Sequence, residues 1–560
     1  MSLGGTSAAP APTASDRPRI LNHAQGRLRA LPSEVWLTAA AVVGFITITI
    51  WWLTQDDRVQ DWDNGLHTIE AFTIHDQLAA GHLTAPFTEF NTYPPFGHFV
   101  GALGVFLAGK SPASVIIASN LVFVPLLAAG CYGVGRLVYR SRRAGLLAAL
   151  FALGTPMIVS EFHEFMLDPQ QAALVAVSVW AIVASDRLRR TWIALLAGVL
   201  AALAMLTKET TEIFLAGLLV VMLLRGGWRN WRGLMAFAIA LLAVAGPWYI
   251  YHRSELNGLV SLHDSQGGPS GNVAGGFFPE RLSRKSFGWY FWDALNIQLL
   301  APFVLAVVIG VVLAVKSSLK DRRPENLLPE MLGGALVSWL GVTLITHKDP
   351  RYSLPALVYM AVLGTGWIAT AKRWRTGLTV AFVAVVLVNL VGVSTGAGGT
   401  VRITLPGAPK PETVLAERSI TLYSPNGWVR GGPEHDGDVL ALMRGLKRIG
   451  VTTVTFDAGS SNDINFNTSG LQVLAIQAGL PTTNVYNPGG LAPREAFMLR
   501  HTLEPWDPPP CEKLNDGTGV YVILGYAYIP FANYTFICPW HHPLLYTRTK
   551  PLPPGAPLSS

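Results

Sequence analysis

The chain has 560 residues, of which 50% are hydrophobic and only 14% are charged. The apolar residues form long blocks, which is not the pattern of a soluble core and indicates a lipid bilayer as the solvent for most of the chain. The formal net charge is +7. The basic residues stand in short clusters between apolar blocks, so they indicate membrane topology and argue against a nucleic-acid partner.

Residues 1–32 are rich in Ala, Pro and Ser and carry four arginines before the first apolar block. This composition predicts a disordered cytoplasmic tail. A cleaved signal peptide is the alternative. However, the apolar run starts too late and lacks a small-residue cleavage site, so we expect the tail to be retained.

Apolar blocks dominate residues 33–395 and predict a polytopic α-helical membrane module, because a helix needs roughly 20 apolar residues to cross the hydrocarbon. Eleven transmembrane helices are predicted, near 33–54, 112–139, 144–160, 169–185, 191–207, 211–225, 233–252, 293–316, 329–346, 352–371 and 375–395. The arginine- and lysine-rich clusters then all fall on the side of the N-terminal tail, which places the N-terminus in the cytoplasm.

One further apolar segment, 96–109, lies in the first outer loop, 55–111. Counting it as a span would invert every later loop and place the basic clusters outside. It is also short for a span, so we predict an interfacial or re-entrant helix there.

Residues 396–560 contain few apolar blocks and many Gly, Pro, Asn and Asp residues, which predicts an extracytoplasmic α/β domain. Strands are expected near 420–425, 452–458, 497–503 and 519–529, and helices near 436–450 and 468–480. Cys511 and Cys538 lie in this domain and are placed to form a disulfide in an oxidising compartment. Two free thiols remain the alternative.

The first outer loop is acidic and rich in histidine. On a helix that starts near Asp63, residues 63, 67 and 70 share one face. Transfer of a sugar to a hydroxyl needs a carboxylate to take the acceptor proton, and Asp61 or Asp63 could supply it. A solvated loop with a helix-capping aspartate is the alternative for either residue.

Four histidines in the same loop could hold a divalent metal ion together with nearby acids, namely His67, His75, His82 and His98, and His67 and Glu70 are the leading candidates. No spacing there matches a recognised ligand signature. A divalent metal ion is therefore possible, and the sequence indicates no other cofactor.

Later outer loops add a second acid and several cations. Asp168 precedes Pro169 at the start of a predicted span, where capping is the alternative role. Lys208 interrupts two apolar blocks, and Lys348 and Arg351 share a short loop with His347. Cations at the outer surface are suited to a lipid-linked phosphate, although a lone lysine could simply snorkel.

These motifs together resemble the GT-C class of polyprenyl-phosphate-dependent glycosyltransferases, in the branch of the protein O-mannosyltransferases and the lipid A aminoarabinose transferase. The resemblance covers roughly residues 33–395 and rests on Asp63 in DNGLH, Pro94 and Pro95 after Tyr93, Asp168, Leu206-Thr207-Lys208, and Arg351-Tyr352 with Pro355. The chain departs from the pattern at Asn64, where a second acid is usual, and at Tyr93, where a lysine is usual.

The resemblance implies that Asp63 is the acceptor-activating base, that Asp168 assists or orients, and that Lys208 and Arg351 hold the donor phosphate. Further candidates for substrate binding are Asp61, His67, Tyr93, Lys348 and Tyr352. The polyprenyl-phosphate sugar is then a substrate, and no nucleotide site is needed.

The leading hypothesis is thus an integral glycosyltransferase, embedded in the lipids of a bacterial plasma membrane, that acts on a glycan, glycolipid or protein acceptor. A transporter or flippase of lipid-linked sugars is the main alternative. Transporters usually place their polar residues near the midplane in repeated broken helices, and no internal repeat is detected. An envelope scaffold is a third hypothesis, but it leaves the acids of the first loop without a joint purpose.

Overall fold

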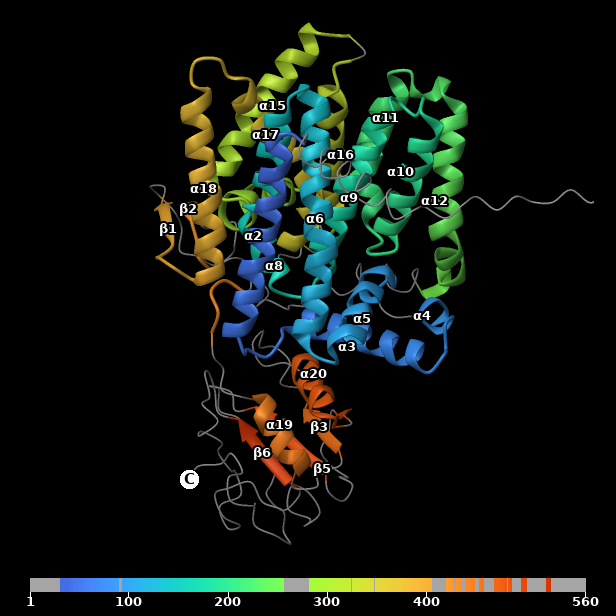
Figure 1. Cartoon of the computed structure of the whole chain (residues 1–560), viewed down its shortest axis with the longest axis vertical. Helices are drawn as coiled ribbons and strands as arrows, with labels where there is room; N and C mark the ends of the chain where they lie inside the picture. The colour runs from blue at the N-terminus through green and yellow to red at the C-terminus, as the bar shows by residue number, and fades with distance from the viewer. Residues whose placement is uncertain are drawn as a thin grey trace, which may run out of the picture.

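The structure is a computed structural model in which long helices form a bundle, with a small sheet region beyond one end (Figure 1). It describes residues 31–89, 93–255, 282–323, 325–346, 348–404, 419–426, 430–434, 439–448, 453–457, 468–480, 482–485, 495–500 and 520–524.

Seven helices of the described chain are long and apolar enough to cross a membrane. They are α2 (Ser33–Gln55), α6 (Pro112–Tyr139), α9 (Leu167–Ala184), α12 (Trp231–Tyr251), α15 (Ala301–Lys320), the continuous segment Pro350–Thr370, which joins η3 (Pro350–Ala356) to α17 (Leu357–Thr370), and α18 (Arg375–Thr395). The pair α7 (Arg142–Leu153) and α8 (Pro156–Phe162) adds an eighth if its 59° bend lies within one span. The bend falls at Pro156, because a proline cannot continue the hydrogen bonding of the preceding helix.

Three shorter apolar helices occupy the remaining predicted places, namely α10 (Thr191–Met205), α11 (Thr211–Leu224) and α16 (Leu328–Leu344). A described helix therefore lies at every predicted position, while length and composition alone support seven or eight spans. The count of eleven stays a prediction.

One predicted helix start is wrong. The span expected from 293 begins at Ala301, after α14 (Arg284–Asp293) and the π-helix η2 (Ala294–Gln298), because Leu300 turns into the left-handed region at φ 67°. The span expected from 352 is found as the continuous segment Pro350–Thr370, and its first part is the η3 segment, which contains two prolines. The polar residues ahead of these helices are thereby held in turns beside the bundle.

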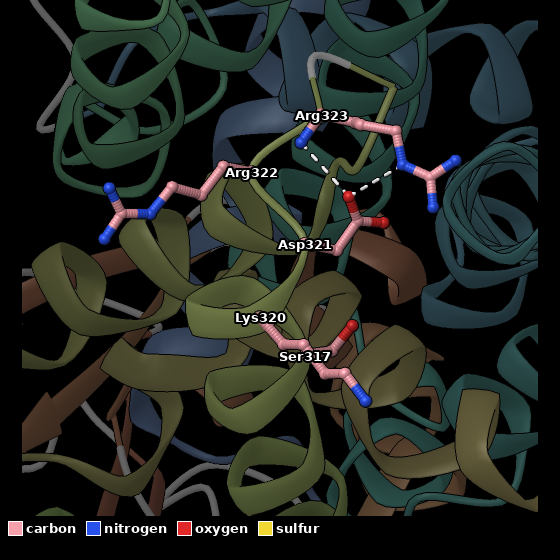
Figure 2. Close-up of a pocket in the computed structure, with 5 residues that line it drawn as sticks. All are labelled: Ser317, Lys320, Asp321, Arg322 and Arg323. Carbon is pink, nitrogen blue, oxygen red and sulfur yellow. Dashed lines mark hydrogen bonds and ion pairs between the residues drawn. The ribbon is translucent and has the colours of Figure 1, made fainter.

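The basic clusters meet at one end of the bundle, which we call the basic end. Arg225 donates to the carbonyl of Arg323 at 2.9 Å and also contacts Glu330, which accepts from Arg187 at 3.3 Å. The end of α15 carries further basic side chains around a hollow of about 550 Å³ (Figure 2). The predicted gathering of the basic clusters is seen, and their compartment stays a prediction.

The first polar loop lies at the other end, which we call the Asp63 end, and folds into α3 (Trp62–Ala79), α4 (Ala85–Thr88) and α5 (Phe96–Ala108) (Figure 1). Helix α5 occupies the place of the predicted interfacial helix and packs against α3 and α6. Gly104 permits the close approach to α6, because a Cβ there would lie 2.2 Å from the Ser114 carbonyl oxygen.

Beyond α18 the described chain contains short strands and helices, of which the first two strands lie beside α18 and most of the others lie beyond the Asp63 end (Figure 1). They are β1 (Val401–Thr404), β2 (Ser419–Tyr423), α19 (Val439–Arg448), β3 (Thr453–Asp457), α20 (Thr468–Ala478), β4 (Thr482–Val485), β5 (Glu495–Arg500) and β6 (Val520–Leu524). Strands β1 and β2 pair antiparallel, and the other four form a parallel sheet in the order β4-β3-β5-β6.

Helix α20 packs on α3, where Gly65 and Gly470 allow the two backbones to meet. The four strands and two helices predicted in this region have counterparts, and β1 and β4 were not predicted. The α/β region as a separate domain stays a prediction. Cys511 and Cys538 lie outside the described residues, so their disulfide is untested.

Candidate active site

Charged side chains from four loops meet at the Asp63 end. Arg351 donates through Nη2 to Oδ2 of Asp63 at 2.8 Å, and Lys208 donates through Nζ to Oδ1 of Asp168 at 2.7 Å. Tyr352 follows Arg351 in the chain, and its ring centroid lies 5.2 Å from Lys208 Nζ. Tyr352 therefore links the two ion pairs. Two carboxylates and two cations that are far apart in the chain thus form one polar cluster.

Tyr93 completes this cluster. Its ring centroid lies 5.8 Å from Lys208 Nζ. Burial and the negative charges of Asp63, Glu209 and Asp168 raise the pKa of the Tyr93 hydroxyl well above its ordinary value. The phenol therefore stays protonated and can donate a hydrogen bond to a ligand.

Asp349 anchors Arg351 and was not predicted. Its carboxylate accepts from Arg351 Nε at 3.0 Å and from Nη2 at 2.8 Å, and it also caps η3 by accepting from the Arg351 amide at 2.9 Å. Burial alone would raise the pKa of Asp349, but the charge and hydrogen bonds of Arg351 outweigh burial and lower it. The signal in the sequence was the Asp-Pro-Arg spacing, which allows the aspartate to cap the turn and grip the guanidinium two residues later.

The acids of the cluster differ sharply in exposure. The Asp63 side chain is 36% exposed, whereas those of Asp168 and Asp349 are 2% and 5% exposed. Of these three, Asp63 is the carboxylate that an incoming hydroxyl group can reach.

Asp168 holds Lys208 and does not cap α9, since no side-chain cap is formed at the start of that helix. Gln171, one turn further along α9, donates to the Lys208 carbonyl at 3.3 Å and to Thr211 Oγ1 at 2.9 Å. Burial alone would lower the pKa of Lys208, but the charge of Asp168 outweighs it and raises the pKa. Lys208 therefore remains a cation.

Two predicted substrate-binding residues serve the fold in this structure. Asp61 is the buried N-cap of α3 and accepts from the Asn64 amide at 2.8 Å. Lys348 is fully buried, and its ammonium donates to the backbone carbonyls of Val342, Thr343 and Ile345 at the end of α16. The short loop turns Lys348 back toward its own helix, away from Arg351. His347 lies outside the described residues.

Three buried side chains of α3 and α5 converge beside Tyr93. His67 Nδ1 lies 3.1 Å from His98 Nε2, and His98 Nε2 lies 2.9 Å from Glu70 Oε2. The sequence predicted His67, Glu70 and His98 among the candidate metal ligands, and the structure brings these three together. We call these three residues the His-Glu triad.

Comparison with known proteins gives a sequence match over part of the chain and a match of the fold over about four fifths of it. Residues 92–251 match the family described as dolichyl-phosphate-mannose-protein mannosyltransferase. ArnT from Cupriavidus metallidurans bound to undecaprenyl phosphate matches with a TM-score of 0.51 and 15% identity over 80% of this chain and 85% of that one. In its apo state ArnT matches with a TM-score of 0.50 and 14% identity over 82% and 86%. These matches confirm the resemblance to GT-C glycosyltransferases.

The oligosaccharyltransferase of Archaeoglobus fulgidus also aligns, with a TM-score of 0.43 and 12% identity over 78% of this chain and 64% of that one. No curated protein sequence matches the chain. The identities are so low that the solved structures establish the GT-C fold alone.

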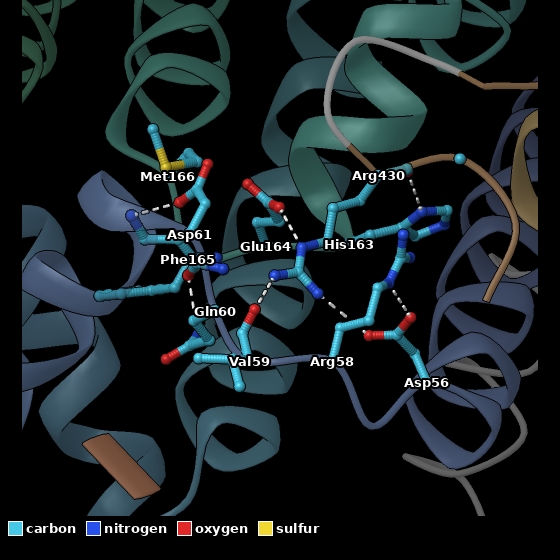
Figure 3. Close-up of polar contacts among 12 residues, drawn as sticks. Asp56, Arg58, Val59, Gln60, Asp61, His163, Glu164, Phe165, Met166 and Arg430 are labelled. Carbon is cyan, nitrogen blue, oxygen red and sulfur yellow. Dashed lines mark hydrogen bonds and ion pairs between the residues drawn. The ribbon is translucent and has the colours of Figure 1, made fainter. Parts of the chain in front are cut away.

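Next to the polar cluster, a second buried network ties the chain after α18 to the loop that follows α2 (Figure 3). Arg430 pairs with Glu164 at 2.7 Å and with Asp56 at 3.3 Å, and it also donates to the Val59 carbonyl. Asp56 further pairs with Arg58 at 2.6 Å. The network fixes the segment that leads into α3, and hence the approach to Asp63. Its partners are up to 374 residues apart, and no sequence pattern linked them.

His163 lies in the same network. Its ring stacks on Trp52 at 4.4 Å between centroids, and Nδ1 donates to the Arg430 carbonyl at 3.3 Å. Trp52 Nε1 donates in turn to the Gly431 carbonyl at 2.8 Å. Burial lowers the pKa of His163 to about 3, so the imidazole is neutral at pH 7.

A pH dependence of stability follows from His163. Below pH 6.5 the His163 side chain is protonated in the unfolded chain, whereas in the folded chain it stays neutral down to about pH 3. The ionisation of His163 therefore leaves the free energy of unfolding unchanged above pH 6.5 and lowers it by about 1.4 kcal/mol per pH unit as the pH drops from 6.5 toward 3. Thermal unfolding of the purified protein between pH 7.5 and 4.5 measures this loss of stability.

The variant His163→Gln should lose the part of the pH dependence that comes from His163, and His75→Gln, on α3, should retain it. Parallel curves for wild type and His163→Gln would contradict the assignment.

Proposed function

We propose that the chain is an integral membrane glycosyltransferase that moves a sugar from a polyprenyl-phosphate donor to a hydroxyl group of an acceptor on the outer face of the membrane. The main support for this proposal is the partly exposed carboxylate of Asp63, which accepts a hydrogen bond from Arg351 and lies in the same cluster as the Lys208–Asp168 pair. The undecaprenyl phosphate bound by the ArnT structure supports a donor of this lipid class.

In the proposed step, the acceptor oxygen forms a bond to the anomeric carbon while the bond from that carbon to the phosphate oxygen breaks. The acceptor proton passes to the Asp63 carboxylate. The bonding pair leaves with the polyprenyl phosphate, which gains one negative charge. Preformed positive charge is most effective at the place where this charge develops.

Lys208 and Arg351 are the cations placed for the leaving phosphate. Arg351 is the better placed of the two to donate hydrogen bonds to the phosphate. Carboxylates hold its Nε and Nη2 in position. Among the described residues, its Nη1 makes only a weak contact, at 4.0 Å to the Met166 sulfur, and so is available to a ligand. Asp168 acts in this proposal by orienting Lys208. Tyr93 and Tyr352 border the same cation and would contact the donor.

The transporter alternative receives no support from the described residues. The polar cluster lies beside the loops at one end of the bundle, whereas transporters bind their substrates near the midplane between repeated broken helices. A reaction at the membrane surface fits the cluster better than passage through the bundle.

The test is direct. The protein is purified in mild detergent, its co-purifying lipid is identified by mass spectrometry, and it is then incubated with polyprenyl-phosphate sugars of the mannose, arabinose and galactosamine types plus membrane extract as acceptor. We expect a bound polyprenyl phosphate and transfer from one donor type. Movement of intact lipid-linked sugar across proteoliposomes without cleavage would instead establish the transporter.

A further inference from the structure

The His-Glu triad brings three metal-ligating atoms to one point in the interior. The three ligand atoms lie within 4.8 Å of one another, and His67, Glu70 and His98 are only 3%, 7% and 0% exposed. Burial of a carboxylate is costly unless the group is paired. This site therefore differs from the acidic surface clusters that are common in proteins.

The contacts within the triad point to a shared ligand. Glu70 Oε2 makes no hydrogen bond among the described residues, although it lies 2.9 Å from His98 Nε2. The carboxylate oxygen is thus close to the ring nitrogen but poorly aligned with it. Two imidazole nitrogens and a carboxylate on a tetrahedral metal ion stand roughly 3.4 Å apart. The spacings of 2.9 and 3.1 Å need only a small outward shift to reach that value.

We propose that His67, Glu70 and His98 bind a zinc ion that fastens α3 to α5. Two imidazoles with one carboxylate form a ligand set that zinc uses, whereas magnesium and calcium prefer oxygen ligands alone. The set leaves a fourth position for water or substrate. His67 and Glu70 come from α3 and His98 from α5, so the ion crosslinks the two helices.

The His-Glu triad lies close enough to the polar cluster to influence its geometry and charge. His67 follows Asp63 by one turn of α3, and its ring lies 5.0 Å from that of Tyr93, which contacts Lys208. The charged groups of the cluster carry a formal sum of −1, from Asp63, Asp168 and Asp349 against Lys208 and Arg351. A dication beside them would fix the helix that carries Asp63 and favour an anionic phosphate. This role rests on the proposed function, whereas the binding of zinc does not.

The binding test uses the full-length protein in detergent, stripped with a chelator and dialysed against zinc. Elemental analysis should give one zinc per chain for wild type, and zinc should raise its melting temperature. Glu70→Gln and His98→Ala should each weaken zinc binding by more than about 100-fold, beyond the effect typical of outer-shell residues. His75→Ala, elsewhere on α3, should bind zinc as wild type does.

Two further results separate this proposal from the proposed function. Asp63→Asn should still bind one zinc with wild-type affinity, because Asp63 is not a ligand, even though its rate of sugar transfer should be strongly lowered. Wild-type protein that takes up no zinc and gains no thermal stability would overturn the site. Equal zinc content in wild type and Glu70→Gln would overturn it as well, whatever the outcome of the transfer assay.

Discussion

Asp63→Asn is expected to lower the rate of sugar transfer by about 100- to 10,000-fold, the range that a positioned general base contributes. Asparagine keeps the size of the side chain and can still accept from Arg351 Nη2, now 2.8 Å from Asp63 Oδ2, but it cannot take the acceptor proton. Because the side chain is 36% exposed, the substitution should leave the fold intact. Transfer of labelled sugar from the polyprenyl-phosphate donor measures the effect.

Asp76→Asn is the matched control for this experiment. Asp76 lies on the same helix, and its side chain is 56% exposed and pairs with Lys110 at the surface. The control should keep wild-type transfer, and both variants should retain co-purified lipid, since neither removes a cation. An Asp63→Asn enzyme with undiminished transfer would remove Asp63 from the chemistry.

The parts of the fold that could be predicted from sequence are those set by local composition. Apolar blocks place the helices, and the basic clusters identify which ends gather together, as the contact of Arg225 with the Arg323 carbonyl shows. The helix start at Ala301 was misplaced because a turn, and not hydropathy, decides where that helix begins. Hydropathy carries no information about a left-handed residue such as Leu300.

The candidate site was predictable where a family motif marks it and hidden where only packing makes it. Asp63, Asp168, Lys208 and Arg351 could be named because each lies in a recognisable motif at a loop. Lys348, in contrast, is equally cationic in the sequence, but its ammonium turns onto the carbonyls at the end of α16. Charge alone does not tell which way a side chain points.

Long-range partners could not be predicted at all. Arg430 is one arginine among many in the sequence, and its pairing with Glu164 and Asp56 depends on the return of the chain after α18 to the first loop. His98 was one of four candidate histidines in the first loop, and it joins the His-Glu triad, while His75 and His82 do not, because α5 packs against α3. In both cases the tertiary structure, not the local pattern, selects the partner.

Arg351→Gln is expected to lower transfer by about 100- to 1,000-fold, the loss found when a preorganised donor to a developing negative charge is removed. The substitution also leaves the buried carboxylate of Asp349 without its cation, which costs about 3–5 kcal/mol and could unfold the protein. The variant alone would therefore not distinguish a role in catalysis from a role in folding.

The double variant Arg351→Gln with Asp349→Asn resolves this, because it replaces the buried ion pair with a neutral hydrogen-bonding pair. We expect its melting temperature to return close to that of wild type while transfer stays low. Arg351→Lys keeps the charge but not the planar fork that grips Asp349 at two points and reaches Asp63, so it should recover only part of the activity. Arg189→Gln, an exposed arginine at the basic end, should change neither quantity. If the double variant regained transfer along with stability, Arg351 would serve only to hold Asp349 in place, and the leaving phosphate would depend on Lys208 alone.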